Sequence, residues 1–117
     1  MSKKSKLLVR RISELVESSV ALRELLVRYE RANINLAKLI ERGEPAAISL
    51  MNLKSPLRRR EMTERLQDFE AARHQVRLAL FALCLEEGAT MSEVGRVLGI
   101  SRQLASRLAN EAEEADS

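Results

Sequence analysis

A chain of 117 residues suits one domain, or a small domain with a long appendage, and it is short for an enzyme with several binding sites. Its three aromatic residues, Tyr29, Phe69 and Phe81, leave the core to aliphatic side chains, which favours helices. The single Cys84 excludes an intramolecular disulfide, and the N-terminal residues lack the apolar run of a signal peptide or membrane span, so we expect a cytoplasmic protein.

The net charge of +3 is unevenly distributed along the chain. The basic residues form two clusters, which are Lys3, Lys4, Lys6, Arg10 and Arg11 near the N-terminus and Lys54, Arg58, Arg59 and Arg60 in the middle. Residues 113–117 form an acidic tail. A basic cluster is more often a solvated face than a nucleic-acid site, so charge alone does not indicate a nucleic-acid partner.

The segment from Ser5 to Arg42 contains neither proline nor glycine, and its apolar residues step by four and three. This heptad spacing predicts one helix about 57 Å long, which Gly43 and Pro45 end. The d positions are Leu8, Leu15, Leu22, Tyr29 and Leu36, and the a positions are Ile12, Ser19, Leu26, Asn33 and Ile40. Asn33 can pair with its twin in a second copy or lie half exposed.

The flanking e and g positions are largely apolar, unlike the charged flanks of a two-stranded zipper. They include Val9, Val16, Leu25, Ala32, Ala37 and Leu39. A stripe this wide on so long a helix needs more than one neighbour, which indicates a helical bundle.

After the first helix, the sequence predicts a short turn or helix that packs on the long helices, in the segment GEPAAISLMNLKS. A second long helix follows it. Ser55 suits the N-cap and Pro56 the first helical position, and the pattern continues to Glu87. Its apolar spacing comprises Met62, Leu66, Phe69, Val76, Leu80 and Leu83, with Arg73 among them. Residues 78–85 are apolar on all sides, so we expect residues 89–117 to fold back over them.

Two short helices are predicted near the C-terminus. Thr90 and Glu93 form a capping box, so a helix begins at Met91 and ends before Gly99. Its expected buried face is Val94, Val97 and Leu98, and Gly95 suits close contact with another helix. Ser101 then caps a second helix with Ala105 and Leu108 on its inner face, and this spacing brings the two helices together at a steep angle.

The stretch MSEVGRVLGISRQLASRL resembles the helix-turn-helix of bacterial transcription regulators, and it is especially similar to region 4 of sigma factors. The resemblance covers residues 76–112 and implies that the helix from Ser101 is a recognition helix in the major groove. Ala105 is smaller than the usual Val or Ile, and Leu104 is apolar where a polar residue often faces DNA. Leu104 can touch a thymine methyl group or pack on the long helices.

The residue types on the proposed recognition helix suit DNA. Arginine can bind guanine O6 and N7, glutamine can bind adenine N6 and N7, and a capping serine with the first backbone N–H groups can bind phosphate. The candidate DNA-binding residues are therefore Ser101, Arg102, Gln103, Ser106 and Arg107, and weaker phosphate candidates are Arg96, Lys54, Arg58, Arg59 and Arg60. The alternative is an ordinary helix pair with solvated arginines.

The predicted fold is all-α: residues 1–87 form a long-helix dimerisation region, residues 88–112 a helix-turn-helix and residues 113–117 an acidic tail. The last turns of the second long helix are also expected to support the helix-turn-helix. A homodimer is expected because a two-fold axis matches two half-sites on DNA. The leading hypothesis is a homodimeric transcription regulator that binds double-stranded DNA and lies with the nucleoid. The alternatives are a helical protein-binding adaptor and an architectural nucleoid protein, and RNA polymerase is a possible further partner.

Nothing in the sequence favours an enzyme. His74, the only histidine, falls at an outward position, and Cys84 lies in the most apolar run. The sequence has no Cys/His metal spacing, no glycine-rich phosphate loop and no nucleophile elbow, so we expect no metal and no cofactor. The target sequence, the sign of regulation and the parallel or antiparallel arrangement of the dimer are left open.

Overall fold

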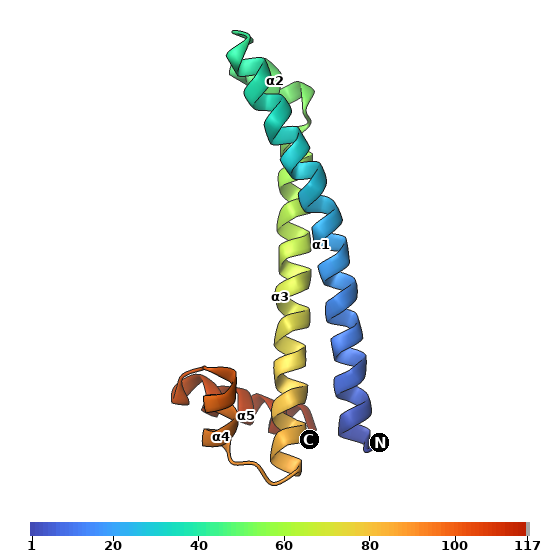
Figure 1. Ribbon diagram of the computed structural model, residues 1–117, viewed down its shortest axis with the longest axis vertical. Helices are drawn as coiled ribbons and strands as arrows, with labels where there is room; N and C mark the ends of the chain where they lie inside the picture. Colours follow the sequence, from blue (N-terminus) through green and yellow to red (C-terminus); the bar gives the residue numbers. More distant parts are fainter. Residues whose placement is uncertain (117) are drawn as a thin grey trace. The chain divides into compact units, whose positions relative to one another are not determined.

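The computed structural model describes residues 1–116, and these form five α-helices and no strand (Figure 1). The helices are α1 (Lys3–Glu41), α2 (Ala46–Asn52), α3 (Ser55–Glu86), α4 (Met91–Leu98) and α5 (Arg102–Asp116). The predicted all-α class, with two long helices followed by a helix-turn-helix region, is confirmed. No helix within residues 1–116 is both long enough and apolar enough to cross a membrane.

The ends of α1 follow from local backbone chemistry. The Ser2 hydroxyl accepts a hydrogen bond from the Ser5 backbone N–H at 3.1 Å, so the helix starts slightly before the predicted residue. Gly43 adopts a left-handed backbone with a φ of 85°, and its N–H donates to the Ile40 carbonyl at 2.9 Å. The Glu44 N–H donates to the Leu39 carbonyl at 3.0 Å, which completes the cap that ends α1.

The short connection between the long helices contains α2, as the sequence predicts, but the predicted cap at Ser55 is wrong. Ser55 is already helical, and the Lys54 carbonyl accepts the Arg58 backbone N–H at 3.1 Å. Lys54 itself has a φ of 54°, and the Arg58 Nε donates to the Leu53 carbonyl at 2.6 Å. The turn therefore depends on the left-handed backbone of Lys54 and on the hydrogen bond from the Arg58 side chain. The Ser-Pro pattern predicts neither of them.

The chain divides into two compact units, to each of which α1 and α3 both contribute. Residues 17–70 form one unit, called here the hairpin unit. Residues 1–16 and 71–116 form the other, called here the terminal unit. The last turns of α3 therefore lie in the same unit as α4 and α5.

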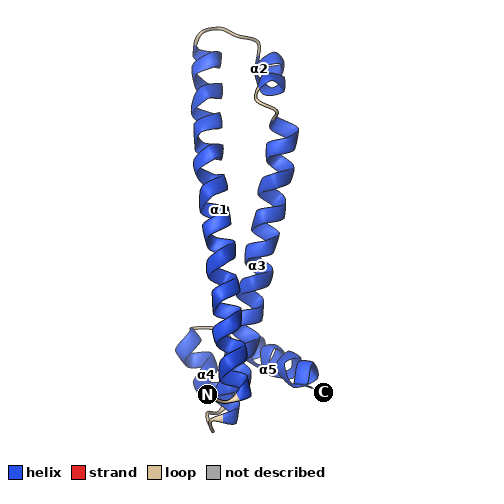
Figure 2. Cartoon of the chain, turned by 90° about the vertical axis from the view of Figure 1, so that its right-hand side faces the viewer, coloured by secondary structure: helices blue, strands red, loops and turns tan. Residues whose placement is uncertain are grey.

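The hairpin unit has a small core. The end of α1 and the start of α3 run antiparallel, and α2 lies in the connection between them (Figure 2). Its buried hydrophobic residues are Leu25 and Ala32, and Ser49 is buried with its hydroxyl donating to the Pro45 carbonyl at 2.9 Å. Its exposed large apolar residues are Leu26, Val27, Tyr29, Ile34, Ile40, Ile48, Leu50, Met51, Leu57 and Leu66.

Within one chain, the wide apolar stripe of α1 in the hairpin unit is buried to different degrees at its heptad positions. Leu25 and Ala32, which are buried, occupy g positions, and the d residues Leu22 and Leu36 are half-buried. The a residues Leu26 and Ile40 are 39% and 49% exposed. Contacts within one chain therefore use the d and g positions and leave the a positions uncovered.

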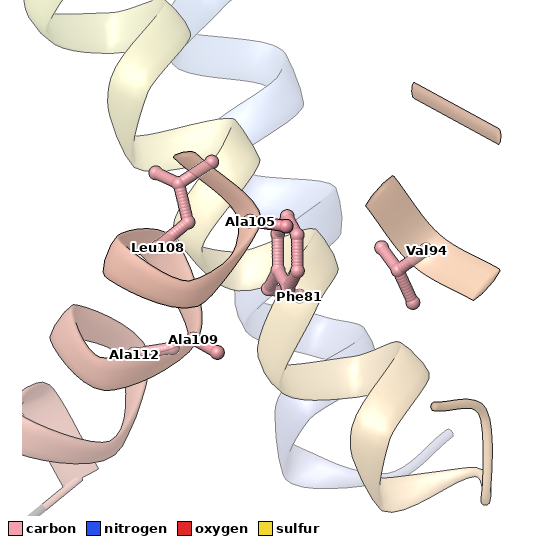
Figure 3. Packing of buried hydrophobic residues seen from close by; sticks show 6 residues of the cluster. All are labelled: Phe81, Val94, Ala105, Leu108, Ala109 and Ala112. Atoms are coloured by element: carbon pink, nitrogen blue, oxygen red, sulfur yellow. The ribbon is translucent and has the colours of Figure 1, made fainter. Parts of the chain in front are cut away.

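The terminal unit contains the larger core. Phe81 of α3 is fully buried, and α4 and α5 close over it (Figure 3). The buried cluster comprises Phe81, Val94, Ala105, Leu108, Ala109 and Ala112. The small side chains on one face of α5 let its backbone approach the aromatic ring closely. The prediction that the C-terminal segment covers the apolar end of the second long helix is confirmed.

Candidate nucleic-acid interface

Both ends of α4 carry caps at the residues where the sequence predicts that the helix begins and ends. The Thr90 hydroxyl accepts the Glu93 backbone N–H at 3.1 Å, so α4 starts at Met91. At its other end Gly99 has a left-handed φ of 68° and donates its N–H to the Arg96 carbonyl at 3.2 Å. These bonds turn the chain within a few residues and direct it into α5.

Gly95 is the point of closest approach between α4 and α5. A Cβ atom built at Gly95 would lie 3.0 Å from the Ala105 Cβ, closer than side chains normally pack. Ala105 is only 1% exposed, so it has no room to withdraw. The prediction that a glycine permits close contact at this position is confirmed, and this contact holds the two helices of the motif together.

A side chain at Gly95 should therefore disturb both folding and the placement of α5. We expect Gly95→Val to lower the free energy of unfolding by about 1–3 kcal/mol, because its methyl groups would overlap Ala105. Chemical denaturation monitored by circular dichroism measures this loss. Val97→Leu, which adds a methylene group to an exposed position of the same helix, is the matched control and should unfold like the wild type. Equal stability of all three proteins would contradict the packing described.

The expected buried face of α4 is correct at Val94 and wrong at Val97. Val94 is 5% exposed and Leu98 is half-buried, whereas Val97 is 86% exposed. The reason is that α5 crosses α4 at Gly95, and the helical spacing puts Gly95 on one side of Val94 and Val97 on the other. Burial on α4 is therefore centred between Val94 and Gly95.

The start and inner face of α5 agree with the prediction. The Ser101 hydroxyl accepts the Leu104 backbone N–H at 3.1 Å, which makes Ser101 the N-cap. Ala105 and Leu108 are each 1% exposed. Leu104 is half-buried and packs against the core cluster around Phe81, so of its two predicted roles the structure supports packing.

The outer face of α5 carries exposed polar side chains. Arg102, Gln103 and Arg107 are exposed, whereas Ser106 is half-buried. Asn110, which is also exposed, follows Gln103 by two helical turns and so lies on the same face. Sequence reasoning missed Asn110, although its seven-residue spacing from Gln103 could have identified it.

A hollow of about 500 Å³ lies between α4 and the start of α5. Its lining includes two basic side chains, Arg96 and Arg102, and the exposed Ser92. Sequence reasoning did not single out Ser92, which lies in the first turn of α4, where a backbone N–H can face an anion. The arrangement can hold an anionic group between the two helices of the motif.

The remaining phosphate candidates belong to the hairpin unit. Lys54, Arg59 and Arg60 are exposed, whereas Arg58 is half-buried and uses its Nε to bind the Leu53 carbonyl. None of these four residues lines the hollow between α4 and α5.

His74 contacts α5, and Cys84 packs against the core that α5 covers. The Nε2 of His74 lies 2.8 Å from Oε2 of Glu111, which links α3 to α5. Both side chains are nearly half exposed, so the pair contributes at most about 1 kcal/mol to stability. Cys84 is half-buried and packs against the core cluster. Within residues 1–116 the structure brings together no group of three His, Cys, Asp or Glu residues that could hold a metal ion.

The comparisons with known proteins agree with this geometry. Residues 74–116 match the MarR family. The matched segment contains α4, α5 and the last turns of α3, which are the helices that surround Phe81. The match supports a bacterial helix-turn-helix transcription regulator, and it does not show the resemblance to sigma factor region 4. No curated protein and no solved structure matches the chain.

Proposed function

We propose that the protein is a homodimeric transcription regulator that reads DNA with α5 in the major groove. The carrying observation is the division of α5 into two faces. Ala105 and Leu108 are sealed in the core, while Arg102, Gln103 and Arg107 project away from it. Arginine and glutamine are the side chains that bind guanine and adenine edges in two-bond geometry, so this face can read a sequence.

Contacts with the DNA backbone would position this face. The hollow between α4 and α5, with Arg96 in its lining, suits one phosphate, and Ser101 with the first N–H groups of α5 suits another. Lys54, Arg58, Arg59 and Arg60 are weaker candidates for further phosphates. Ser106, which is half-buried, remains a candidate on the same helix.

Selection of bound fragments from random duplex DNA at two salt concentrations tests this function. A dimeric regulator should enrich a shared palindrome, with half-sites separated by about one helical turn, and should keep its preference at higher salt. Fragments without a common sequence, whose affinity only follows the salt concentration, would instead support an architectural nucleoid protein. Absence of duplex binding would reject both functions.

The hairpin unit provides the argument for a homodimer. Ten large apolar side chains are exposed on it, while only Leu25 and Ala32 form its buried hydrophobic core. An apolar surface of this kind is characteristic of a protein–protein contact. A second copy of the chain is the simplest occupant, because it supplies the two-fold axis that paired half-sites require.

The a positions of α1 are the proposed centre of the dimer contact. Leu26, Asn33 and Ile40 are spaced by seven residues, lie on one face of the helix and are all exposed in the single chain. The Asn33 Nδ2 donates to the Tyr29 carbonyl at 2.8 Å, so its Oδ1 is the atom that can accept a bond from the other copy. An asparagine at such a position can fix the register of two helices.

Light scattering tests this dimer. The wild type should have about twice the chain mass of 13.2 kDa, and Leu26→Gln with Ile40→Gln should dissociate it. The two changes remove four half-exposed apolar side chains from the dimer, each worth about 1 kcal/mol, so the dissociation constant should rise two to three orders of magnitude. Val97→Gln replaces an apolar side chain at an exposed position of α4 and should leave the mass measured by light scattering unchanged.

The exposed hairpin unit also favours one alternative, a helical adaptor that binds another protein. A wild-type chain that stays monomeric in light scattering would support this alternative and contradict the homodimer. RNA polymerase is one possible partner of such a surface. Binding of the selected duplex by a dimer would favour the regulator, acting on the nucleoid in the cytoplasm.

A further inference from the structure

The N-terminal basic cluster belongs to the same compact unit as the helix-turn-helix. Residues 1–16 and 71–116 form the terminal unit, and in both views the first turns of α1 lie beside the last turns of α3 (Figures 1 and 2). A hollow of about 700 Å³ is lined by Lys3, Lys4, Lys6, Leu7, Arg10 and Glu86. Glu86 is the last residue of α3, so these cations lie near the connection that leads into α4.

The charges of the terminal unit are divided unequally between its two segments. Residues 71–117 carry five arginines against seven carboxylates, so the segment with the helix-turn-helix is by itself net acidic. Residues 1–16 carry five basic residues against the single Glu14. Binding of duplex DNA depends on cations that neutralise phosphates, so most of the excess positive charge of this unit comes from the start of α1.

Three of these cations lie exposed on one side of α1. Lys3, Lys6 and Arg10 are exposed, and their spacing of three and four residues places them on one side of α1 over about 10 Å. Arg11 differs because its guanidinium already binds Glu14 at 3.0 Å. Lys4 also differs because it is half-buried and interacts within the protein.

We infer that Lys3, Lys6 and Arg10 form a second DNA-binding surface that contacts backbone phosphates beside the site entered by α5. This inference rests on the proposed DNA binding. These two lysines and the arginine would bind phosphate oxygens and not base edges. Phosphate contacts position a protein on DNA without reading its sequence. The surface would raise affinity for every duplex equally and leave the choice of sequence to α5.

The salt dependence of binding to the selected duplex tests the second surface. We compare the full-length wild type with the variant Lys3→Gln, Lys6→Gln and Arg10→Gln between 50 and 200 mM salt. Three lost phosphate contacts should make the slope of log affinity against log salt shallower by about 2.7 per bound chain. Over this range the affinity should therefore fall about 40-fold more for the wild type than for the variant for each bound chain, and on the order of 1,000-fold more for a dimer with both chains bound.

Matched variants separate a contact from a general charge effect. Arg31→Gln, Lys38→Gln and Arg42→Gln remove three exposed charges from the hairpin unit and should leave the slope unchanged. Lys3→Arg with Lys6→Arg should retain the wild-type slope. An unchanged slope in the Lys3, Lys6 and Arg10 variant, with its fold verified by circular dichroism, overturns the second surface while DNA binding stands. A wild type that binds no duplex overturns the proposed function itself.

Discussion

Replacing Phe81 by alanine should lower the free energy of unfolding of the terminal unit by about 3–5 kcal/mol. Phe81 is fully buried and belongs to the hydrophobic cluster that joins α3, α4 and α5. Alanine would leave a cavity lined by residues such as Val94 of α4 and Leu108 of α5. A small domain has only about 5–15 kcal/mol of stability, so this loss should lower the melting temperature on the order of 15–25 °C.

Thermal unfolding monitored by circular dichroism measures the effect of this substitution. Phe69→Ala is the matched control, because it removes the same ring from a half-buried position of α3 in the hairpin unit. We expect Phe69→Ala to lower the melting temperature much less than Phe81→Ala. Equal melting temperatures of Phe81→Ala and wild type would show that the core around α5 is not formed as described.

Replacing Arg102 and Arg107 together by alanine should weaken binding to the selected duplex at least 100-fold. Each arginine that binds a base in two-bond geometry contributes about 1–3 kcal/mol, and a dimer loses both contacts at each half-site. Both side chains are exposed, so their removal should leave the fold intact. Fluorescence anisotropy with the selected duplex measures the loss of affinity.

The control for this loss is a pair of arginines outside the terminal unit. Arg28→Ala with Arg31→Ala removes the same charge from exposed positions of α1 in the hairpin unit and should weaken binding far less. Unaltered affinity in the Arg102 and Arg107 variant would reject α5 as the reading surface. An equal loss in both variants would attribute binding to net charge instead of to base contacts.

The local geometry of the motif was predictable because it depends on neighbouring residues. A threonine cap at position 90, a left-handed glycine at 99 and a serine cap at 101 each satisfy backbone groups within a few residues, so sequence spacing identifies them. The buried face of α4 was less predictable. It depends on where α5 crosses, and that crossing excludes Val97 while burying Gly95.

The heptad pattern of α1 illustrates a second limit. A stripe that is apolar at the a, d, e and g positions offers more than one contact face, and the pattern does not say which face the chain uses itself. The structure buries Leu25 and Ala32 against the chain and leaves Leu26 and Ile40 exposed. On α5, the seven-residue spacing of Asn110 from Gln103 puts both on one face, so the sequence pattern could have identified Asn110 as a further candidate.

Mapping the duplex onto the protein by nuclear magnetic resonance tests the central claim most directly. The backbone amide shifts of the wild type are compared with and without the selected duplex. The account predicts that the largest changes fall at Ser101, Arg102, Gln103 and Arg107, with smaller changes at Lys3, Lys6 and Arg10. Changes confined to the hairpin unit, or none on α5 while the duplex is bound, would contradict the claim that the exposed face of α5 reads DNA.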